Sequence, residues 1–185
     1  MLVKNKSKQT GFTLVELIVV IIILGILSAV ALPKFMSVTD DAQRSAIKGA
    51  AGGLGAGAAL FHAQWVANGH TSTTDNVAGF GDSTLDSNDN GWAVGTGGGA
   101  ANPDATAATC VLVWDNIMQG PPKAVATTFG SNADYVATAL GKVCTFTYHG
   151  GQSTAPTIDY DKDSGTAAAA VTITYNFSTG AVSAQ

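Results

Sequence analysis

An apolar run near the N-terminus constrains this chain more than any other feature. It extends from Phe12 to Leu32. At about 1.5 Å per residue it can form a helix of roughly 30 Å, the thickness of the hydrocarbon core of a bilayer. Three lysines precede it with no acid among them (Lys4, Lys6 and Lys8), so the positive-inside rule predicts a cytoplasmic N-terminus. By length and flanks alone, the run predicts a single membrane anchor.

One carboxylate, that of Glu16, lies inside this run. An ionised group in a lipid-exposed helix costs about 2.5–3.5 kcal/mol on insertion scales. No Lys, Arg or His lies between residues 12 and 33, so a cationic partner cannot come from the same span. We therefore expect Glu16 either to be protonated in lipid or to meet a cation from another molecule. A cut after Gly11 would supply that cation on every copy of the chain, as the new amine of Phe12.

The segment GFTLVE at residues 11–16, with the basic leader before it and Pro33 after it, closely resembles the class III signal of type IV prepilins. The resemblance implies that a prepilin peptidase cuts between Gly11 and Phe12, and that Phe12 is then N-methylated. It also implies that Phe12 and Glu16 pair between neighbouring subunits during assembly. The implied partners are copies of this chain, related pilins, the inner-membrane assembly platform and, before assembly, membrane lipid. The implied location changes from the inner membrane to an extracellular pilus.

A second processing route competes with this one. Residues 29–31, Ala-Val-Ala, look like the small-residue cleavage site of a secretory signal peptide. That cut would release a protein starting at Leu32 and would leave Glu16 without a purpose. Apolar regions of secretory signals are typically about 7–15 residues long and hold no acid, so the longer run with its glutamate favours the prepilin route.

The rest of the chain predicts an α+β fold, in which a long N-terminal helix packs on an antiparallel sheet after a long connecting loop. This is the type IV pilin-like architecture that the resemblance implies. The expected segments, in chain order, are a cleaved leader (1–11), the apolar membrane and filament helix (12–33), its amphipathic continuation (34–68), the connecting loop (69–109) and the globular head (110–185).

The helix is expected to continue past Pro33, with a kink there because proline lacks an N–H and clashes with the preceding turn. Apolar residues then recur at steps of three and four and define one face: Ile47, Ala51, Leu54, Ala58, Phe61 and Trp65. Five glycines lie between them: Gly49, Gly52, Gly53, Gly55 and Gly57. They indicate either close backbone packing or a break near Gly52–Gly53, because each costs up to about 1 kcal/mol against alanine in a helix.

After Asn68–Gly69, residues 70–108 have the composition of a surface loop, which Phe80 and Trp92 are expected to hold against the core. The apolar spacing of residues 109–119 favours a short helix ended by Gly120-Pro121-Pro122. Alternating side chains then predict strands at 142–148, 157–160, 171–177 and 181–183.

The charge of the chain argues against one class of function, nucleic-acid binding. Beyond Leu32 the chain has six basic and 12 acidic residues, a net −6, which argues against binding nucleic acid through a basic face.

In an oxidising compartment the two cysteines, Cys110 and Cys144, are expected to form a disulfide. Closing a loop of about 35 residues would stabilise the fold by roughly 3–4 kcal/mol on the chain-entropy model.

Two acidic segments are candidate calcium sites. Asp86, Asn88 and Asn90 match the first half of an EF-hand loop, but its twelfth position is Gly97 instead of glutamate. Asp159, Asp161 and Asp163 form a similar run, with Ala170 at the twelfth position. The competing interpretation is an Asn/Asp/Gly turn at the first segment and a hairpin turn at the second.

No enzyme motif is present: the sequence lacks G-x-S-x-G, H-E-x-x-H and a phosphate-binding loop. His62, His70 and His149 lie outside metal-binding motifs, and His62 is expected at a surface or an interface. We expect no cofactor and no catalytic residue.

Four segments look most like pilins of the mannose-sensitive haemagglutinin (MSHA) type: residues 32–35, 40–42, 63–65 and 68–69. The resemblance implies a filament used for attachment, with a surface or a glycan as receptor. Cys144 departs from the family pattern, since many type IV pilins place the second cysteine near the C-terminus. Two alternatives stay open: a minor or tip pilin that binds through residues 70–108, and a pseudopilin of a type II secretion system.

Overall fold

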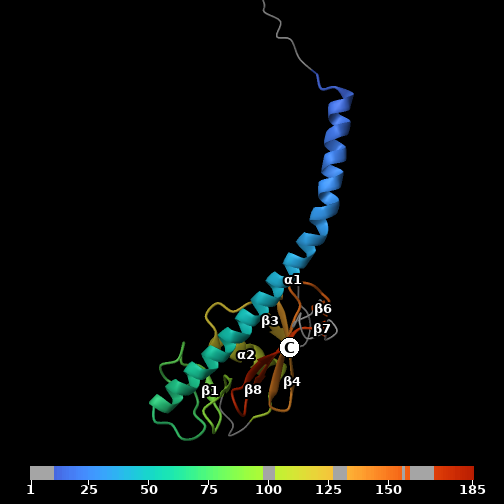
Figure 1. Cartoon of the computed structure of the whole chain (residues 1–185). Helices are drawn as coiled ribbons and strands as arrows, with labels where there is room; N and C mark the ends of the chain where they lie inside the picture. The colour runs from blue at the N-terminus through green and yellow to red at the C-terminus, as the bar shows by residue number, and fades with distance from the viewer. Residues whose placement is uncertain (1–10, 98–102, 127–132, 156, 159–168) are drawn as a thin grey trace, which may run out of the picture. The chain divides into compact units, whose positions relative to one another are not determined.

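A computed structural model describes residues 11–97, 103–126, 133–155, 157–158 and 169–185 (Figure 1). The chain divides into two compact units, residues 1–41 and 42–185. The second unit holds all the strands and the second helix. The predicted α+β class is therefore confirmed.

Helix α1 (Leu14–Ala67) is continuous. It passes through Gly52 and Gly53 without a break, so the interpretation of these glycines as a helix break is wrong. Five of the six residues that the spacing predicts for the inward face are buried: Ile47, Leu54, Ala58, Phe61 and Trp65. The sixth, Ala51, is half-buried, and its neighbour Ala50 is buried. The helix ends next to Gly69, whose φ of +77° is the left-handed conformation common after a helix C-terminus.

Helix α2 (Ala107–Ile117) begins at a capping box. The hydroxyl of Thr106 accepts from the N–H of Thr109 at 3.1 Å, and the N–H of Thr106 donates to the hydroxyl of Thr109 at 2.9 Å. Two backbone donors at the helix start are thereby satisfied. The helix ends before Gly120 and two prolines, as predicted from the sequence.

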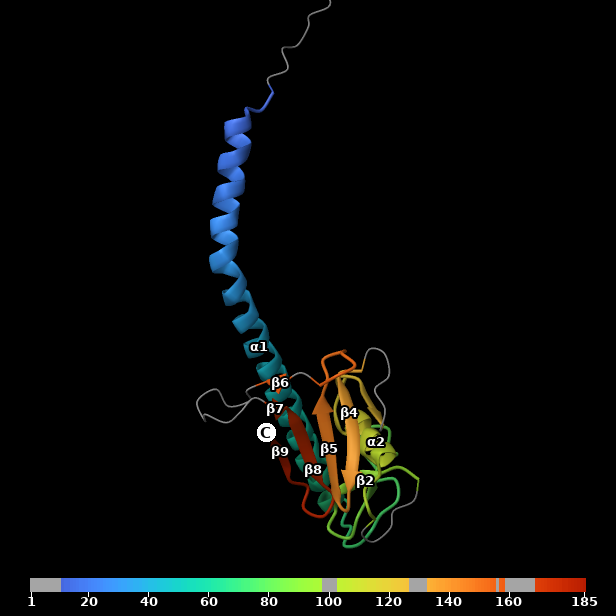
Figure 2. The same cartoon turned by 90° about the vertical axis from the view of Figure 1, so that its right-hand side faces the viewer.

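The main sheet has five strands in the order β3-β4-β5-β8-β9, and Figure 2 shows its central strands side by side. Their bounds are β3 Ala124–Ala126, β4 Tyr135–Leu140, β5 Val143–Tyr148, β8 Thr172–Asn176 and β9 Val182–Ala184. Strands β5, β8 and β9 lie at the predicted positions. Strands β3 and β4 were not predicted.

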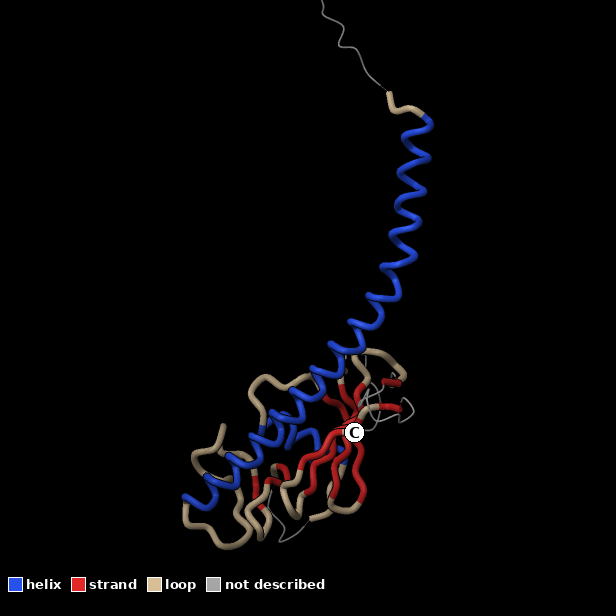
Figure 3. Tube along the Cα trace, in the orientation of Figure 1, coloured by secondary structure: helices blue, strands red, loops and turns tan. Residues whose placement is uncertain are grey.

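The main sheet is antiparallel, as expected, except at one edge. Strand β3 runs parallel to β4, whereas the other neighbouring strands of the main sheet are antiparallel. Two further two-stranded sheets are present: β1 (Asp86–Ser87) with β2 (Ala93–Gly95), and β6 (Thr157–Ile158) with β7 (Ala169–Ala170). The first of these adds regular structure inside the predicted loop 69–109. Figure 3 draws the strands in red and the loops in tan.

The core of the second unit lies between the main sheet and its helices. Alternate side chains along the strands point into this core. They include Tyr135 on β4, Phe146 on β5 and Tyr175 on β8. Trp114 of α2 packs against the first two rings, with centroids 4.9 and 4.4 Å away. The buried face of α1 completes this core.

Tyr175 connects the core to the segment before α2. Its hydroxyl donates to the carbonyl of Ala93 at 3.0 Å, and burial raises the pKa of the Tyr175 phenol above its usual value. A buried hydroxyl needs such an acceptor.

Candidate functional site

The start of α1 is the candidate site, because it holds the residues that the sequence marks for processing and assembly. Residues 11–13 are not helical, and the helix begins at Leu14. Phe12 is 90% exposed. A Cβ on Gly11 would meet no atom of the described residues within 4 Å.

Thr13 and Glu16 form a reciprocal capping box at this helix start. The N–H and the hydroxyl of Thr13 both donate to Oε2 of Glu16, at 2.8 and 2.9 Å. The N–H of Glu16 in turn donates to the hydroxyl of Thr13, at 3.2 Å. The sequence gives no cationic partner for Glu16 in its own span, and the structure adds neutral donors from Thr13 instead.

This pair was missed at the level of the sequence, although a signal for it exists. Thr-x-x-Glu immediately before an apolar run is the pattern of a capping box.

The apolar part of the helix follows directly. Leu14–Leu32 is long and apolar enough to cross a membrane, and no part of it is buried in the structure. Its one hydroxyl, on Ser28, donates to the carbonyl of Leu24 at 2.7 Å, so this polar group is satisfied within the helix. The motif and the apolar helix together fit a membrane-anchored precursor.

Helix α1 continues through Pro33 without interruption. The kink proposed for this position stays a prediction from the missing N–H of proline.

Cys110 and Cys144 form the expected disulfide, with their Cα atoms 5.6 Å apart. The bond joins α2 to strand β5 across the interior of the second unit, and both residues are fully buried. It therefore fixes the helix to the centre of the sheet.

The first calcium candidate is a buried turn whose side chains bind the protein itself. Asn88 is fully buried: its Oδ1 accepts from the N–H groups of Asn90 and Trp92, both at 2.9 Å. Asp86 is 2% exposed and accepts from the N–H of Asn76 at 2.8 Å. These contacts match the competing interpretation, a turn stabilised by Asn and Asp side chains.

The second calcium candidate, Asp159, Asp161 and Asp163, lies outside the described residues. Among the residues that are described, no group of three His, Cys, Asp or Glu side chains comes together in a metal-binding arrangement.

His62 lies half-buried between two indole rings. Its ring stacks on Trp92 at 4.2 Å and faces Trp65 at 5.8 Å, and its Nδ1 donates to the carbonyl of Gly91 at 3.2 Å. This cluster holds the predicted loop against α1. Phe80, the other predicted anchor, meets Phe61 edge to face at 5.2 Å.

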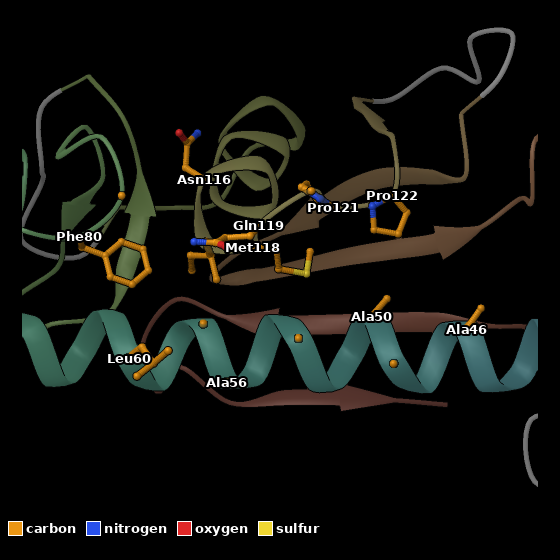
Figure 4. Close-up of a pocket in the computed structure, with 16 residues that line it drawn as sticks. Ala46, Ala50, Ala56, Leu60, Phe80, Asn116, Met118, Gln119, Pro121 and Pro122 are labelled. Atoms are coloured by element: carbon orange, nitrogen blue, oxygen red, sulfur yellow. The ribbon is translucent and has the colours of Figure 1, made fainter.

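A groove of about 550 Å³ runs between α1 and residues 116–122. Figure 4 shows Leu60 and Phe80 at one end and Ala46 and Pro122 at the other. Its helix wall carries only small residues before Leu60: Ala46, Gly49, Ala50, Gly53, Ala56 and Gly57. These small residues let Ile117 and Met118 approach the helix; the sulfur of Met118 would lie 3.5 Å from a Cβ on Gly53.

Comparison with known proteins finds similarity to part of the chain. Residues 6–32 match the family model of the prokaryotic N-terminal methylation motif. The chain is 47% identical over 45 residues to the type II secretion system core protein G of Pseudomonas aeruginosa, covering 24% of this chain and 32% of that protein.

Two further relatives are filament proteins by name. The type IV major alpha-pilin of Moraxella bovis is 46% identical over 57 residues, 30% of this chain and 36% of that protein. A fimbrial protein of Neisseria meningitidis is 46% identical over 74 residues, 36% of this chain and 44% of that protein. The chain thus spans less than half of the length of these relatives, and no solved structure matches it.

Proposed function

We infer that this type IV pilin-like chain is a structural subunit that polymerises through its N-terminal helix into an extracellular filament. The observation that carries the proposal is the helix segment Leu14–Leu32, which is apolar and entirely unburied in a single molecule. Such a surface needs lipid or copies of itself to cover it. The match to the methylation motif at residues 6–32 supports both environments: lipid before assembly, and other copies of the helix in the filament.

The proposed sequence of events begins in the inner membrane, with the N-terminus in the cytoplasm. Prepilin peptidase removes residues 1–11, and Phe12 is methylated on its new amine. An assembly platform then withdraws the subunit from lipid, and the apolar helix packs against those of other copies. Within the pilins we propose an MSHA-type subunit of a filament for attachment, on the strength of residues 32–35 and 63–65.

Glu16 selects the register of this packing. A carboxylate among apolar helices is stabilised by an opposite charge, and the Phe12 amine of a neighbouring copy supplies one. Since both groups recur once in every copy, only registers that bring them together avoid an unpaired charge.

A pseudopilin is the second candidate. The similarity to the type II secretion system core protein G over 45 residues supports it, because the N-terminal signal is the same in both classes. A pilin dominates filaments sheared from the cell surface, whereas a pseudopilin or a minor pilin is scarce in them.

The test is Glu16→Ala in cells that express the full chain. We expect leader cleavage to continue and sheared filaments to be lost, because the amine of the neighbouring copy has no carboxylate to meet. Ser28→Ala is the matched control, since it removes the other polar side chain of the segment Leu14–Leu32 and should leave filaments unchanged. Normal filaments from the Glu16→Ala strain would refute the pairing role.

A further inference from the structure

We propose that Leu140 of one copy docks into the groove between α1 and residues 116–122 of the next copy in the filament. This inference rests on the proposed function and adds a contact between the second units, residues 42–185, to the packing of the N-terminal helices. Three observations carry it: an apolar groove, an exposed leucine at the other end of α2, and opposite charges near the two.

Leu140 is the last residue of β4 and is 86% exposed. Among the described residues of the second unit it is the most exposed large apolar side chain. The turn that follows is held at the start of α2, because the N–H of Ala105 donates to the carbonyl of Gly141 at 2.7 Å. A side chain on such a fixed turn loses little conformational freedom when it docks. A single exposed leucine is common on protein surfaces, so its role depends on a matching groove.

The matching groove lies at the other end of α2 (Figure 4). Its apolar lining includes Leu60, Phe80, Ile117 and Pro122, and its volume of about 550 Å³ exceeds that of a leucine side chain. Helix α2 has 11 residues, a length of about 16 Å. Leu140 is exposed and does not line the groove of its own molecule, so a second copy has to supply the leucine.

A contact of this kind joins two different surfaces of the same chain. Each copy would use Leu140 on one neighbour and its groove on the other. Such heterologous contacts produce open helical filaments wherever the rotation between copies does not close a ring, whereas a two-fold dimer uses one and the same surface on both copies. The placement of the leucine and the groove at opposite ends of α2 therefore suits a filament subunit.

The end of the second unit that carries Leu140 is acidic. Residues 70–104 hold five aspartates and no lysine or arginine. This segment adjoins the turn after Leu140, because Oδ1 of Asp104 lies 3.0 Å from Nζ of Lys142. Lys142 neutralises one aspartate, and the others leave this end with a negative charge.

The groove is flanked by basic residues at its Ala46 end. The α1 segment 42–60 contains Arg44 and Lys48 and no acid, and Lys123 directly follows the groove residue Pro122. One acid is close by, since Asp134 accepts from the N–H of Lys123 at 3.1 Å. Three basic groups against one acid make this end positive. Opposite charges favour contact between the two ends and disfavour contact between like ends.

Disulfide trapping in sheared filaments tests the contact. A chain with both Leu140→Cys and Ala46→Cys carries one new thiol at the turn and one at the groove, while its native cysteines are already paired. After oxidation with copper phenanthroline we expect a ladder of dimers, trimers and longer covalent chains on non-reducing gels, because every copy is linked to two neighbours. Either substitution alone should give no ladder, since one new cysteine links two copies at most.

The matched control combines Leu140→Cys with Ala59→Cys. Ala59 is an exposed position of α1 that does not line the groove, so this pair should give no ladder.

A second variant decides the case in which the double-cysteine chain does not assemble. Leu140→Ser removes the apolar side chain from an exposed site, so the chain should remain folded. Burial of a leucine side chain corresponds to about tenfold or more in an equilibrium constant. We therefore expect about a tenfold lower yield of sheared filaments at an unchanged level of folded chain. Val66→Ser, at an exposed valine of α1 outside the groove, is the control and should leave the yield unchanged.

The outcomes separate this contact from the proposed function. A ladder from the chain with Leu140→Cys and Ala46→Cys, or, where that chain does not assemble, the low yield from Leu140→Ser, supports the contact. Filaments of the double-cysteine chain without a ladder, or a wild-type yield from Leu140→Ser, overturn it while the proposed function stands. If the wild-type chain is absent from sheared filaments, the proposed function fails and this contact fails with it.

Discussion

At the scale of single residues, Asn88 holds together segments that lie far apart in the sequence. Its Nδ2 donates to the carbonyl of Phe177 at 2.6 Å, and its Oδ1 accepts from the N–H groups of Asn90 and Trp92. The side chain is fully buried. One amide thus joins the turn after β1 to the end of strand β8.

We predict that Asn88→Ala lowers the free energy of unfolding by more than about 2 kcal/mol, because it leaves buried donors and an acceptor without partners. Asn90→Ala is the control: Asn90 is exposed and its side chain makes a longer bond, 3.3 Å, to the carbonyl of Ser178. It should change stability by less than about 0.5 kcal/mol. Urea unfolding of the full chain in mild detergent, followed by tryptophan fluorescence, measures both, and equal effects would contradict the structural role.

The same residue shows where sequence reasoning reaches its limit. The pattern Asp-x-Asn-x-Asn-Gly at residues 86–91 identifies a turn and also a set of calcium-type ligands. Local sequence cannot decide between a turn and a calcium site, because the side-chain amide of Asn88 donates to the carbonyl of Phe177, which is 89 positions away. The capping box of Thr13 and Glu16, by contrast, is a local pattern and could have been predicted from four residues.

At the scale of elements, the glycines of α1 differ in what surrounds them. A Cβ on Gly57 would lie 2.7 Å from the carbonyl oxygen of Ile117 and would also collide with its side chain. A Cβ on Gly49 or Gly52 would meet nothing within 4 Å. Gly57 therefore sets how closely α1 approaches the end of α2.

We predict that alanine changes the free energy of unfolding in opposite directions at two of these positions. Gly57→Ala should lower the free energy of unfolding by about 1–3 kcal/mol, because it forces α1 and α2 apart. Gly49→Ala should raise it by up to about 1 kcal/mol, since alanine favours the helix and finds free space. Denaturant unfolding compares the two, and a gain of stability from Gly57→Ala would show that the close approach at Ile117 is wrong.

The elements also differ in how well their sequence predicts them. Strands β5 and β8 alternate large apolar and polar residues, and α2 has a clear apolar spacing, so each could be located. Strand β4 (Tyr135–Leu140) contains alanine at two positions, so its alternation of large apolar and polar residues is weak. Its register is set by six paired positions on β5, a long-range constraint that no local pattern contains.

At the scale of the whole molecule, the chain combines a segment with a buried core and a segment that buries nothing. Residues 42–185 bury a core of large aromatic side chains, closed by the Cys110–Cys144 disulfide. Residues 14–32 bury nothing. The cleavage site that we propose lies immediately before the unburied helix, so one cut would both remove the basic leader and create the amine that we pair with Glu16.

The apolar N-terminal helix and the α+β class could be predicted from the sequence, because they depend on a continuous apolar run and on local patterns of apolar residues. The mixed sheet could not, since parallel pairing of β3 with β4 depends on contacts across the sheet. The function proposed for the chain depends mainly on the predictable part.

Intact-mass spectrometry of the subunit in purified sheared filaments tests the central claim most directly. We predict a chain of residues 12–185 that carries one added methyl group on Phe12 and an intact disulfide. A subunit that starts at Leu32 would contradict the account, because the helix proposed as the filament core would then be absent from the mature protein.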